Sequence, residues 1–335
     1  MEQPLSPDSW QYRALNAITP GLNYLSDALI DLVEKGHPVM AGSADLQYSN
    51  GLNKFAARYP DRYIQFGISE QNMVSAAAGL ATVGHMPFVA TFASFLGLLC
   101  CEQIRMDVAY CRQPVRLIGH HTGISLGFYG TSHHATEDIS TMRAIAGLTV
   151  ISPADGPTLA AAIRASVDWR EPIYFRIGRG REPDVYDTSM DFEIGRAIEH
   201  SRGEDLTMIA CGMPVKETLE AAGKLRKEGL SVGVLDMATI KPLDREAVLR
   251  AARRCRLLMT VEEHNIIGGL GAAVAEVLSE EGPGTRLLRH GIRDRYSLIA
   301  PPNHLYAHYR LDAQGIAATA RDALKALPGA PRCRA

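Results

Sequence analysis

Short apolar runs alternate with longer stretches of helical periodicity from Pro38 onward. This alternation is typical of β-α units stacked around a mostly parallel sheet. In the first part of the chain it predicts strands over residues 39–41, 63–66, 87–90, 115–118, 148–151 and 173–175. Helices are predicted in most of the gaps, notably over residues 69–83 and 157–167.

A charged segment that contains Gly and Pro interrupts this pattern between Arg176 and Arg202. Such a segment is typical of an interdomain linker that crosses the surface. The alternation then resumes, with strands predicted over 206–210, 232–235, 257–261 and 286–289 and helices around 215–228, 245–255, 269–280 and 313–326. We therefore predict an α/β fold of two mostly parallel-sheet domains, residues 15–180 and 205–327, joined by a linker at 181–204.

Composition and charge exclude several classes of protein. With 335 residues and 46% hydrophobic content, the chain can bury two substantial cores. A formal net charge of -2 gives no global basic field, so no nucleic acid partner is expected. Neither a long apolar run nor a leader-like apolar block within residues 1–25 occurs, and the six cysteines have no C-x-x-C spacing. We therefore expect a soluble, cytoplasmic protein with reduced thiols and no membrane contact.

The first candidate site lies where a predicted strand turns into a helix at Ser69 and Glu70. Ser69 suits a helix N-cap, and a carboxylate in the first turn favours the helix dipole. Glu70 also heads a helical stripe with Val74, Ala77 and Ala81, which should pack inward. A carboxyl group at the head of a buried stripe needs a partner, so Glu70 has either a capping or a functional role.

Phe92 and Phe95 form a second candidate site just after an apolar strand, one helical turn apart. Such a pair either belongs to the core or lines the pocket of a flat aromatic ligand, because π systems attract one another beyond simple burial.

A third candidate is the glycine-rich segment 119–134, which follows a predicted strand and holds four of the eleven histidines. Loops at the carboxyl ends of parallel strands are where open α/β sheets bind ligands. The histidines suit contact with sugar hydroxyls and proton transfer, or structural hydrogen bonds. A metal site is disfavoured, because the two histidine pairs do not have a common zinc spacing and Glu137 and Asp138 follow rather than separate them.

Seven short motifs, in order along the chain, resemble those of the carboxyl-terminal half of the transketolase family. They are GSADL (42–46), GISEQN (67–72), TFASF (91–95), GTSHH (130–134), SPAD (152–155), FR (175–176) and EEHNIIGG (262–269). The resemblance covers about residues 20–325. It implies a thiamine-diphosphate-binding pyrimidine domain followed by a transketolase C-terminal domain.

The resemblance also implies roles at the cofactor. Glu70 matches the glutamate that hydrogen-bonds the aminopyrimidine ring of thiamine diphosphate and activates it for catalysis. Phe92 and Phe95 match the aromatic wall of the aminopyrimidine pocket, and Asp45 matches an acidic residue of the cofactor site.

Other positions match residues that contact the sugar substrates. His121 and His133 match histidines that contact donor and acceptor, and they are expected to be catalytic together with Glu70. Arg176 and Ser49 match residues that bind a sugar phosphate. Tyr129 stands where the family has an aspartate that contacts an acceptor hydroxyl, and Asn23 stands where many members have a second phosphate-binding arginine. These two departures put pentose-phosphate specificity in doubt.

The other half of a transketolase holds Mg²⁺ and the cofactor's diphosphate with a Gly-Asp-Gly motif followed by Asn. No Gly-Asp-Gly occurs in this sequence. We therefore expect a separate subunit to supply that half, in a heterotetramer of two plus two chains, with Mg²⁺ held by the partner and no metal ligand in this chain.

The expected activity is the transfer of a two-carbon ketol unit from a ketose or ketose phosphate to an aldehyde. One alternative is a thiamine-diphosphate enzyme that acts on a 2-oxo acid, like deoxyxylulose-phosphate synthases or 2-oxo acid dehydrogenase β subunits. Another is a non-catalytic interaction subunit that has kept only the fold. The second domain shows no catalytic constellation and is expected to enlarge the subunit interface, although His264 could do more than lie on its surface.

Overall fold

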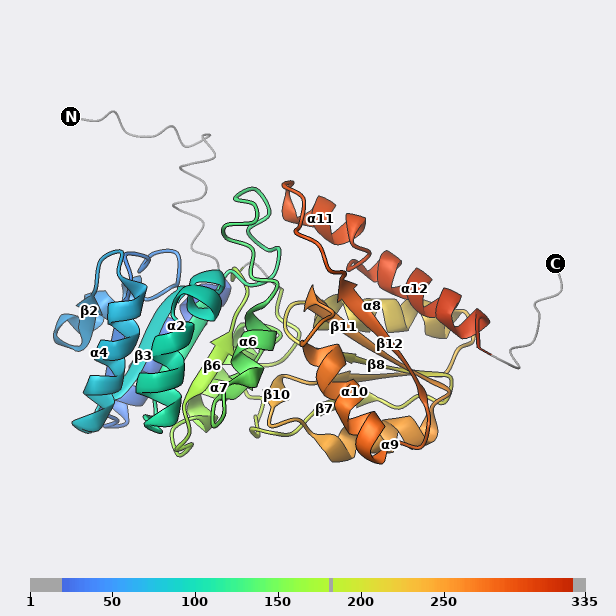
Figure 1. Ribbon diagram of the computed structural model, residues 1–335, viewed down its shortest axis with the longest axis horizontal. Helices are drawn as coiled ribbons and strands as arrows, with labels where there is room; N and C mark the ends of the chain where they lie inside the picture. The colour runs from blue at the N-terminus through green and yellow to red at the C-terminus, as the bar shows by residue number, and fades with distance from the viewer. Residues whose placement is uncertain (1–19, 181–182, 328–335) are drawn as a thin grey trace.

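A computed structural model describes residues 20–180 and 183–327 and contains two sheets side by side (Figure 1). Residues 15–19 of the first predicted domain and 181–182 of the predicted linker lie outside the described residues. The two sheets confirm the predicted α/β fold class, because most neighbouring strands in each sheet are parallel.

The first sheet has the strand order β10-β5-β6-β4-β3-β1-β2. Its strands are β1 (Val39–Ser43), β2 (Tyr63–Gln65), β3 (Met86–Phe92), β4 (Arg116–His120), β5 (Thr149–Ile151), β6 (Ile173–Arg176) and β10 (Thr239–Lys241). The helices of this part are α2 (Pro20–Glu34), α3 (Asn53–Arg58), α4 (Glu70–Thr82), α5 (Cys101–Gln103), α6 (Asp138–Ala144) and α7 (Gly156–Ala165). A 3₁₀ helix forms η1 (Pro60–Arg62), and π-helical turns form η2 (Phe95–Leu99) and η3 (Ile104–Tyr110).

The second sheet has the order β12-β11-β8-β9-β7. Its strands are β7 (Ile198–Ser201), β8 (Leu206–Ala210), β9 (Val232–Asp236), β11 (Leu257–Asn265) and β12 (Arg286–Ile292). Its helices are α8 (Pro214–Lys227), α9 (Arg245–Arg254), α10 (Leu270–Glu281), α11 (Pro302–His308) and α12 (Ala313–Lys325).

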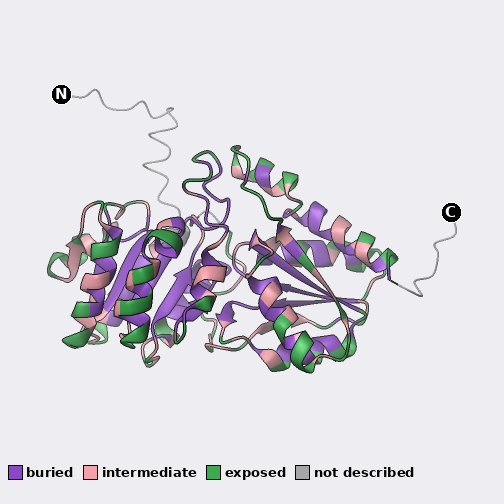
Figure 2. Cartoon of the chain, viewed as in Figure 1, coloured by how far each residue is buried: buried purple, intermediate pink, exposed green. Residues whose placement is uncertain are grey.

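Both faces of the first sheet are apolar, as a parallel sheet covered by helices on each side requires. Phe88 of β3 joins one core cluster with Leu29 of α2, whereas its neighbour Val89 joins another with Met73 of α4. The second cluster continues into the second domain at Leu235. The strands of both sheets are therefore mostly buried (Figure 2), and one of the apolar clusters extends across both domains.

Two short strands cross the domain boundary that the sequence predicts. β7 lies within the predicted linker and pairs antiparallel with β9, at the edge of the second sheet. β10 comes from the second-domain part of the sequence, yet it pairs antiparallel with β5 and ends the first sheet. The segment from 183 to 204 is therefore partly a structural element of the second sheet rather than only a connection.

Candidate active site

The candidate site lies at the carboxyl ends of β3 and β4, which are neighbouring parallel strands. Phe92 ends β3 and is the register partner of His120, which ends β4. The segments that follow the two strands therefore start side by side, at the sheet edge where open α/β sheets bind ligands. Phe95 begins η2, a π-helical turn of the kind that recurs at functional sites.

Side chains from these two segments form one group, the aromatic–histidine cluster: Phe92, Phe95, His120, His121, Tyr129 and His133. The Phe92 ring is central, with its centroid 5.4 Å from that of Phe95, 5.3 Å from His121 and 5.2 Å from His133. The Tyr129 ring lies 4.9 Å from that of His133. The structure thus brings together the phenylalanine pair and the two histidines that the sequence singled out separately.

His120 is a member of the cluster that sequence reasoning did not select. It is completely buried, and its Nδ1 lies 2.6 Å from the Nδ1 of His121, so one of these nitrogens donates to the other. Burial lowers the pKa of His120 to about 3, so its ring is neutral at physiological pH. Burial also lowers the pKa of His133. The available signal for His120 was its place at a strand end, next to His121.

Glu70 begins α4 and is 6% exposed. Ser69 precedes the helix but accepts no capping hydrogen bond with its side chain, and its hydroxyl donates to the Phe66 carbonyl at 2.7 Å. Glu70 lies close to Cys100, which directly follows η2. The pKa of the Cys100 thiol is raised to about 12, mainly by burial and in addition by the charge of Glu70. Within the described residues, no hydrogen bond reaches the Glu70 carboxylate. A buried carboxylate without a partner is ready to bind a ligand donor.

Asp45 and Ser49 lie on the loop after β1, at the same edge of the sheet. Asp45 is exposed and adopts a positive φ of 59°, and its backbone N–H donates to the Gln65 side chain at 2.7 Å. The Ser49 hydroxyl donates to the Leu46 carbonyl at 3.1 Å. In the described part of the chain, no hydrogen bond or ion pair joins these side chains to the aromatic–histidine cluster.

Arg176 ends β6, but the structure does not bring it to this cluster. Its guanidinium is buried and forms an ion pair with Asp138 at 2.9 Å. It also donates to the carbonyls of Ala135 at 3.2 Å and Glu263 at 2.9 Å. Its observed partners therefore belong to the junction between the two domains, and its phosphate-binding role stays a prediction.

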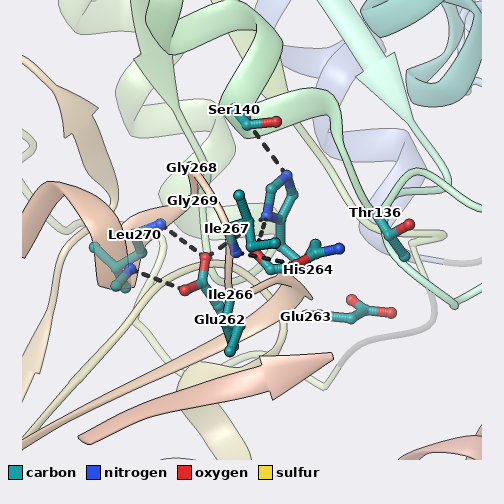
Figure 3. A network of polar contacts seen from close by, with 12 residues as sticks. Thr136, Ser140, Glu262, Glu263, His264, Ile266, Ile267, Gly268, Gly269 and Leu270 are labelled. Carbon is teal, nitrogen blue, oxygen red and sulfur yellow. Dashed lines mark hydrogen bonds and ion pairs between the residues drawn. The ribbon is translucent and has the colours of Figure 1, made fainter. Parts of the chain in front are cut away.

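A buried polar network occupies that junction around His264 (Figure 3). His264 Nδ1 donates to the Asn265 carbonyl at 2.6 Å, which leaves Nε2 to accept from the Ser140 N–H at 3.4 Å. Only the neutral imidazole can make both bonds. Burial lowers the pKa of His264 to about 4, in agreement with that assignment. His264 is thus a buried junction residue rather than a surface one.

Among residues 20–180 and 183–327, no group of three or more His, Cys, Asp and Glu side chains is arranged to hold a metal ion. No helix in these ranges is long and apolar enough to cross a membrane.

Comparison with known proteins identifies the family. The model of the transketolase pyrimidine-binding domain matches residues 22–183, and that of the transketolase C-terminal domain matches residues 195–316. The chain belongs to the transketolase family. An apulose-4-phosphate transketolase subunit of Phocaeicola vulgatus is 36% identical over 90% of this chain and 96% of its own length. A 6-deoxy-6-sulfo-D-fructose transketolase subunit of a Clostridium species is 35% identical over 88% and 92%.

The solved structures agree with this membership of the transketolase family. A split-gene transketolase described as an inactive beta4 tetramer superposes with a TM-score of 0.82 at 37% identity, over 90% of this chain and 97% of that chain. These matches confirm the resemblance that the seven motifs carry. Membership in the family implies dependence on thiamine diphosphate.

Proposed function

We propose that this chain is one subunit of a split transketolase, which transfers a two-carbon ketol unit from a ketose or ketose phosphate to an aldehyde. The observation that carries the proposal is Glu70, a buried carboxylate without a hydrogen bond in the described chain. Glu70 lies next to η2. This turn begins with Phe95, whose ring belongs to the aromatic–histidine cluster. A buried carboxyl group needs a partner, and a ligand ring nitrogen with a proton to share provides one.

These residues fit the aminopyrimidine ring of thiamine diphosphate. Phe92 and Phe95 meet edge to face with a centroid distance of 5.4 Å, a geometry that suits a further aromatic ring. Glu70 would hold the proton at a ring nitrogen, and Asp45 would lie at the rim of the site. When bound, thiamine diphosphate supplies the carbon nucleophile needed to break and form carbon–carbon bonds.

The histidines would bind the sugar. A neutral imidazole both donates and accepts one hydrogen bond, which matches a sugar hydroxyl, and it can accept a proton. Burial lowers the pKa of His133, so this side chain is neutral at physiological pH. We assign substrate contact to His121 and His133, with Tyr129 and Ser49 at the periphery.

We further propose that a second subunit holds Mg²⁺ and the cofactor's diphosphate, in a heterotetramer of two plus two chains. The names of the similar proteins support the need for a separate partner subunit, since two are subunits and the solved split-gene relative is described as an inactive beta4 tetramer. The proposed location is the cytoplasm, where thiols stay reduced, and the cysteines of the described residues are all free.

Reconstitution tests the proposal. The chain is purified alone and co-expressed with a partner subunit that carries the Gly-Asp-Gly…Asn motif, and calorimetry then measures binding of thiamine diphosphate with Mg²⁺. We expect tight binding and ketol transfer only in the complex. Tight Mg²⁺-dependent binding by the single chain would refute the split-enzyme proposal. Release of carbon dioxide from pyruvate, without ketol transfer from any ketose, would instead identify a 2-oxo acid enzyme.

A further inference from the structure

The histidine loop, residues 121–136, carries His121, Tyr129 and His133, and it is closed at its base. Gly123 and Ala135 form an antiparallel bridge, with N–O distances of 3.1 and 2.9 Å between their backbones. The loop projects beside α11 of the second domain (Figure 1), and the Gly127 carbonyl accepts from the Ala300 N–H at 3.3 Å. The segment that bears the proposed sugar-binding histidines is therefore in contact with the second domain.

Glu263 of β11 reaches the base of this loop from the second domain. Its side chain is 1% exposed, and Oε1 accepts from the Ile124 N–H at 2.7 Å. The neighbouring Gly123 has a φ of +57°, and a Cβ at this position would lie 2.2 Å from the Glu263 carboxyl carbon. Only glycine allows both the backbone conformation and the close approach of the carboxylate.

The backbone near Glu263 also holds the other side of the loop. The Asn265 N–H donates to the Thr136 carbonyl at 2.9 Å. Arg176 donates to the Ala135 carbonyl and to the Glu263 carbonyl from the same nitrogen, at 3.2 and 2.9 Å. Both ends of the loop are thus tied to the end of β11.

Glu262 provides a comparison within the same strand. Figure 3 shows the carboxylates of Glu262 and Glu263 directed to opposite sides of β11, as consecutive strand residues are. Glu262 accepts from the N–H groups of Leu270 and Gly271, at 2.7 and 2.8 Å, where α10 begins. Both carboxylates are buried and accept backbone N–H groups, but only Glu263 is bonded to the histidine loop.

We infer that Glu263 is a positioning residue of the second domain, which sets the place of His121 and His133 by holding the base of the histidine loop. The inference rests on the proposed function for its consequence in catalysis, but not for the loop contact itself. A charge-assisted hydrogen bond in a buried site is stronger than a neutral one. Displacement of a substrate-binding group by about 1 Å can cost on the order of 100-fold in rate.

Glu263→Gln and Glu263→Asp separate the reach of this side chain from its charge. Gln keeps an acceptor at the same distance from the Ile124 N–H, whereas Asp keeps the charge but withdraws it by one methylene. In the complex, we expect Glu263→Asp to lower kcat/KM for the ketose by about 10-fold to 100-fold, with unchanged affinity for thiamine diphosphate. Glu263→Gln should keep most of the wild-type kcat/KM. The matched control is Glu262→Asp, which we expect to alter thermal stability without this loss of kcat/KM.

Hydrogen exchange on the single chain tests the loop contact without any activity. We expect amide exchange over 124–135 to be at least about 10-fold faster in Glu263→Asp than in Glu262→Asp, because a buried hydrogen bond to a charged group is lost. Equal protection of this segment in the two variants would overturn the inference, and so would unchanged kcat/KM in Glu263→Asp. A wild-type complex without ketol transfer would refute the proposed function instead, and the exchange result would still decide the loop contact.

Discussion

Asp138 accepts a hydrogen bond from Arg176 Nε at 2.9 Å, and both side chains are about 1% exposed. The Tyr174 hydroxyl donates to the same carboxylate oxygen at 2.8 Å. Burial alone would lower the pKa of Arg176, but the negative charges of Asp138 and Glu263 raise it overall. The two side chains therefore form a buried ion pair at the point where the first sheet, the histidine loop and the second domain meet.

Asp138→Asn should destabilise the chain by about 3–5 kcal/mol, because it leaves the Arg176 cation buried without its counter-charge. Guanidinium denaturation of the two proteins measures this difference. Glu281→Gln, which removes one exposed partner of Arg245, is the control and should shift the midpoint little.

Arg176→Lys separates the structural role of this residue from the phosphate-binding role that the motif implies. We expect a lower denaturation midpoint, because Lys cannot reproduce the planar set of donors that reaches Asp138, Ala135 and Glu263. A higher KM for a phosphorylated sugar at unchanged stability would favour the phosphate-binding role.

Glu70→Ala in the reconstituted complex should lower turnover by about 10²–10⁴-fold, because it removes the group assigned to proton transfer at the cofactor. Glu246→Ala is the matched control, since Glu246 is also a first-turn glutamate but is exposed at the start of α9. If Glu70→Ala keeps near-normal turnover at saturating cofactor, Glu70 serves only the helix.

His264→Gln should make the free energy of unfolding less dependent on pH. An unfolded histidine takes up a proton below about pH 6.5, whereas buried His264 stays neutral down to about pH 4. The folded state therefore loses stability as pH falls through this window, by about 3 kcal/mol from this group. Urea denaturation across the window should show a smaller loss in the variant than in the wild type.

Two comparisons make this measurement specific. Burial raises the pKa of Glu262 to about 7, but this group is present in both proteins, so its titration largely cancels in the difference. Replacement of the exposed His308 by Gln controls for the loss of a histidine elsewhere in the chain. Equal loss of stability on acidification in wild type and His264→Gln would contradict a buried neutral imidazole.

The sequence predicted the parallel strands because most of them are buried on both faces and so consist of apolar runs. The sequence did not predict β7 and β10, because they lack such an apolar run. Ile198–Ser201 and Thr239–Lys241 are short edge strands with polar residues, and their pairing depends on tertiary packing rather than on an apolar run.

The site was predictable to the extent that its residues follow neighbouring strands. Phe92 and the histidines converge because β3 and β4 are adjacent and parallel. Burial of Glu263 and His264 was not predictable, because an acidic and polar strand end normally faces solvent. Here the histidine loop and α6 of the first domain cover this end of β11.

We expect Tyr129 to influence acceptor specificity. It is 52% exposed, and its ring lies against that of His133. The resemblance to transketolases places an aspartate that contacts an acceptor hydroxyl at this position. The aromatic face should tolerate a less hydroxylated or branched aldehyde, and Asn23 cannot replace the bidentate phosphate contact of an arginine. We therefore expect kcat/KM for ribose 5-phosphate to be lower than for at least one deoxy, branched or unphosphorylated aldehyde with the same ketose donor.

Tyr129→Asp tests the cause of this preference. Because it restores a hydroxyl acceptor beside His133, it should move the ratio of kcat/KM toward ribose 5-phosphate, whereas Tyr129→Phe should not. Phe128→Asp, at the neighbouring exposed ring, controls for added negative charge on the loop. A wild-type complex that prefers ribose 5-phosphate by a wide margin would show that Tyr129 and Asn23 do not exclude this acceptor, and that the specificity is set by other contacts.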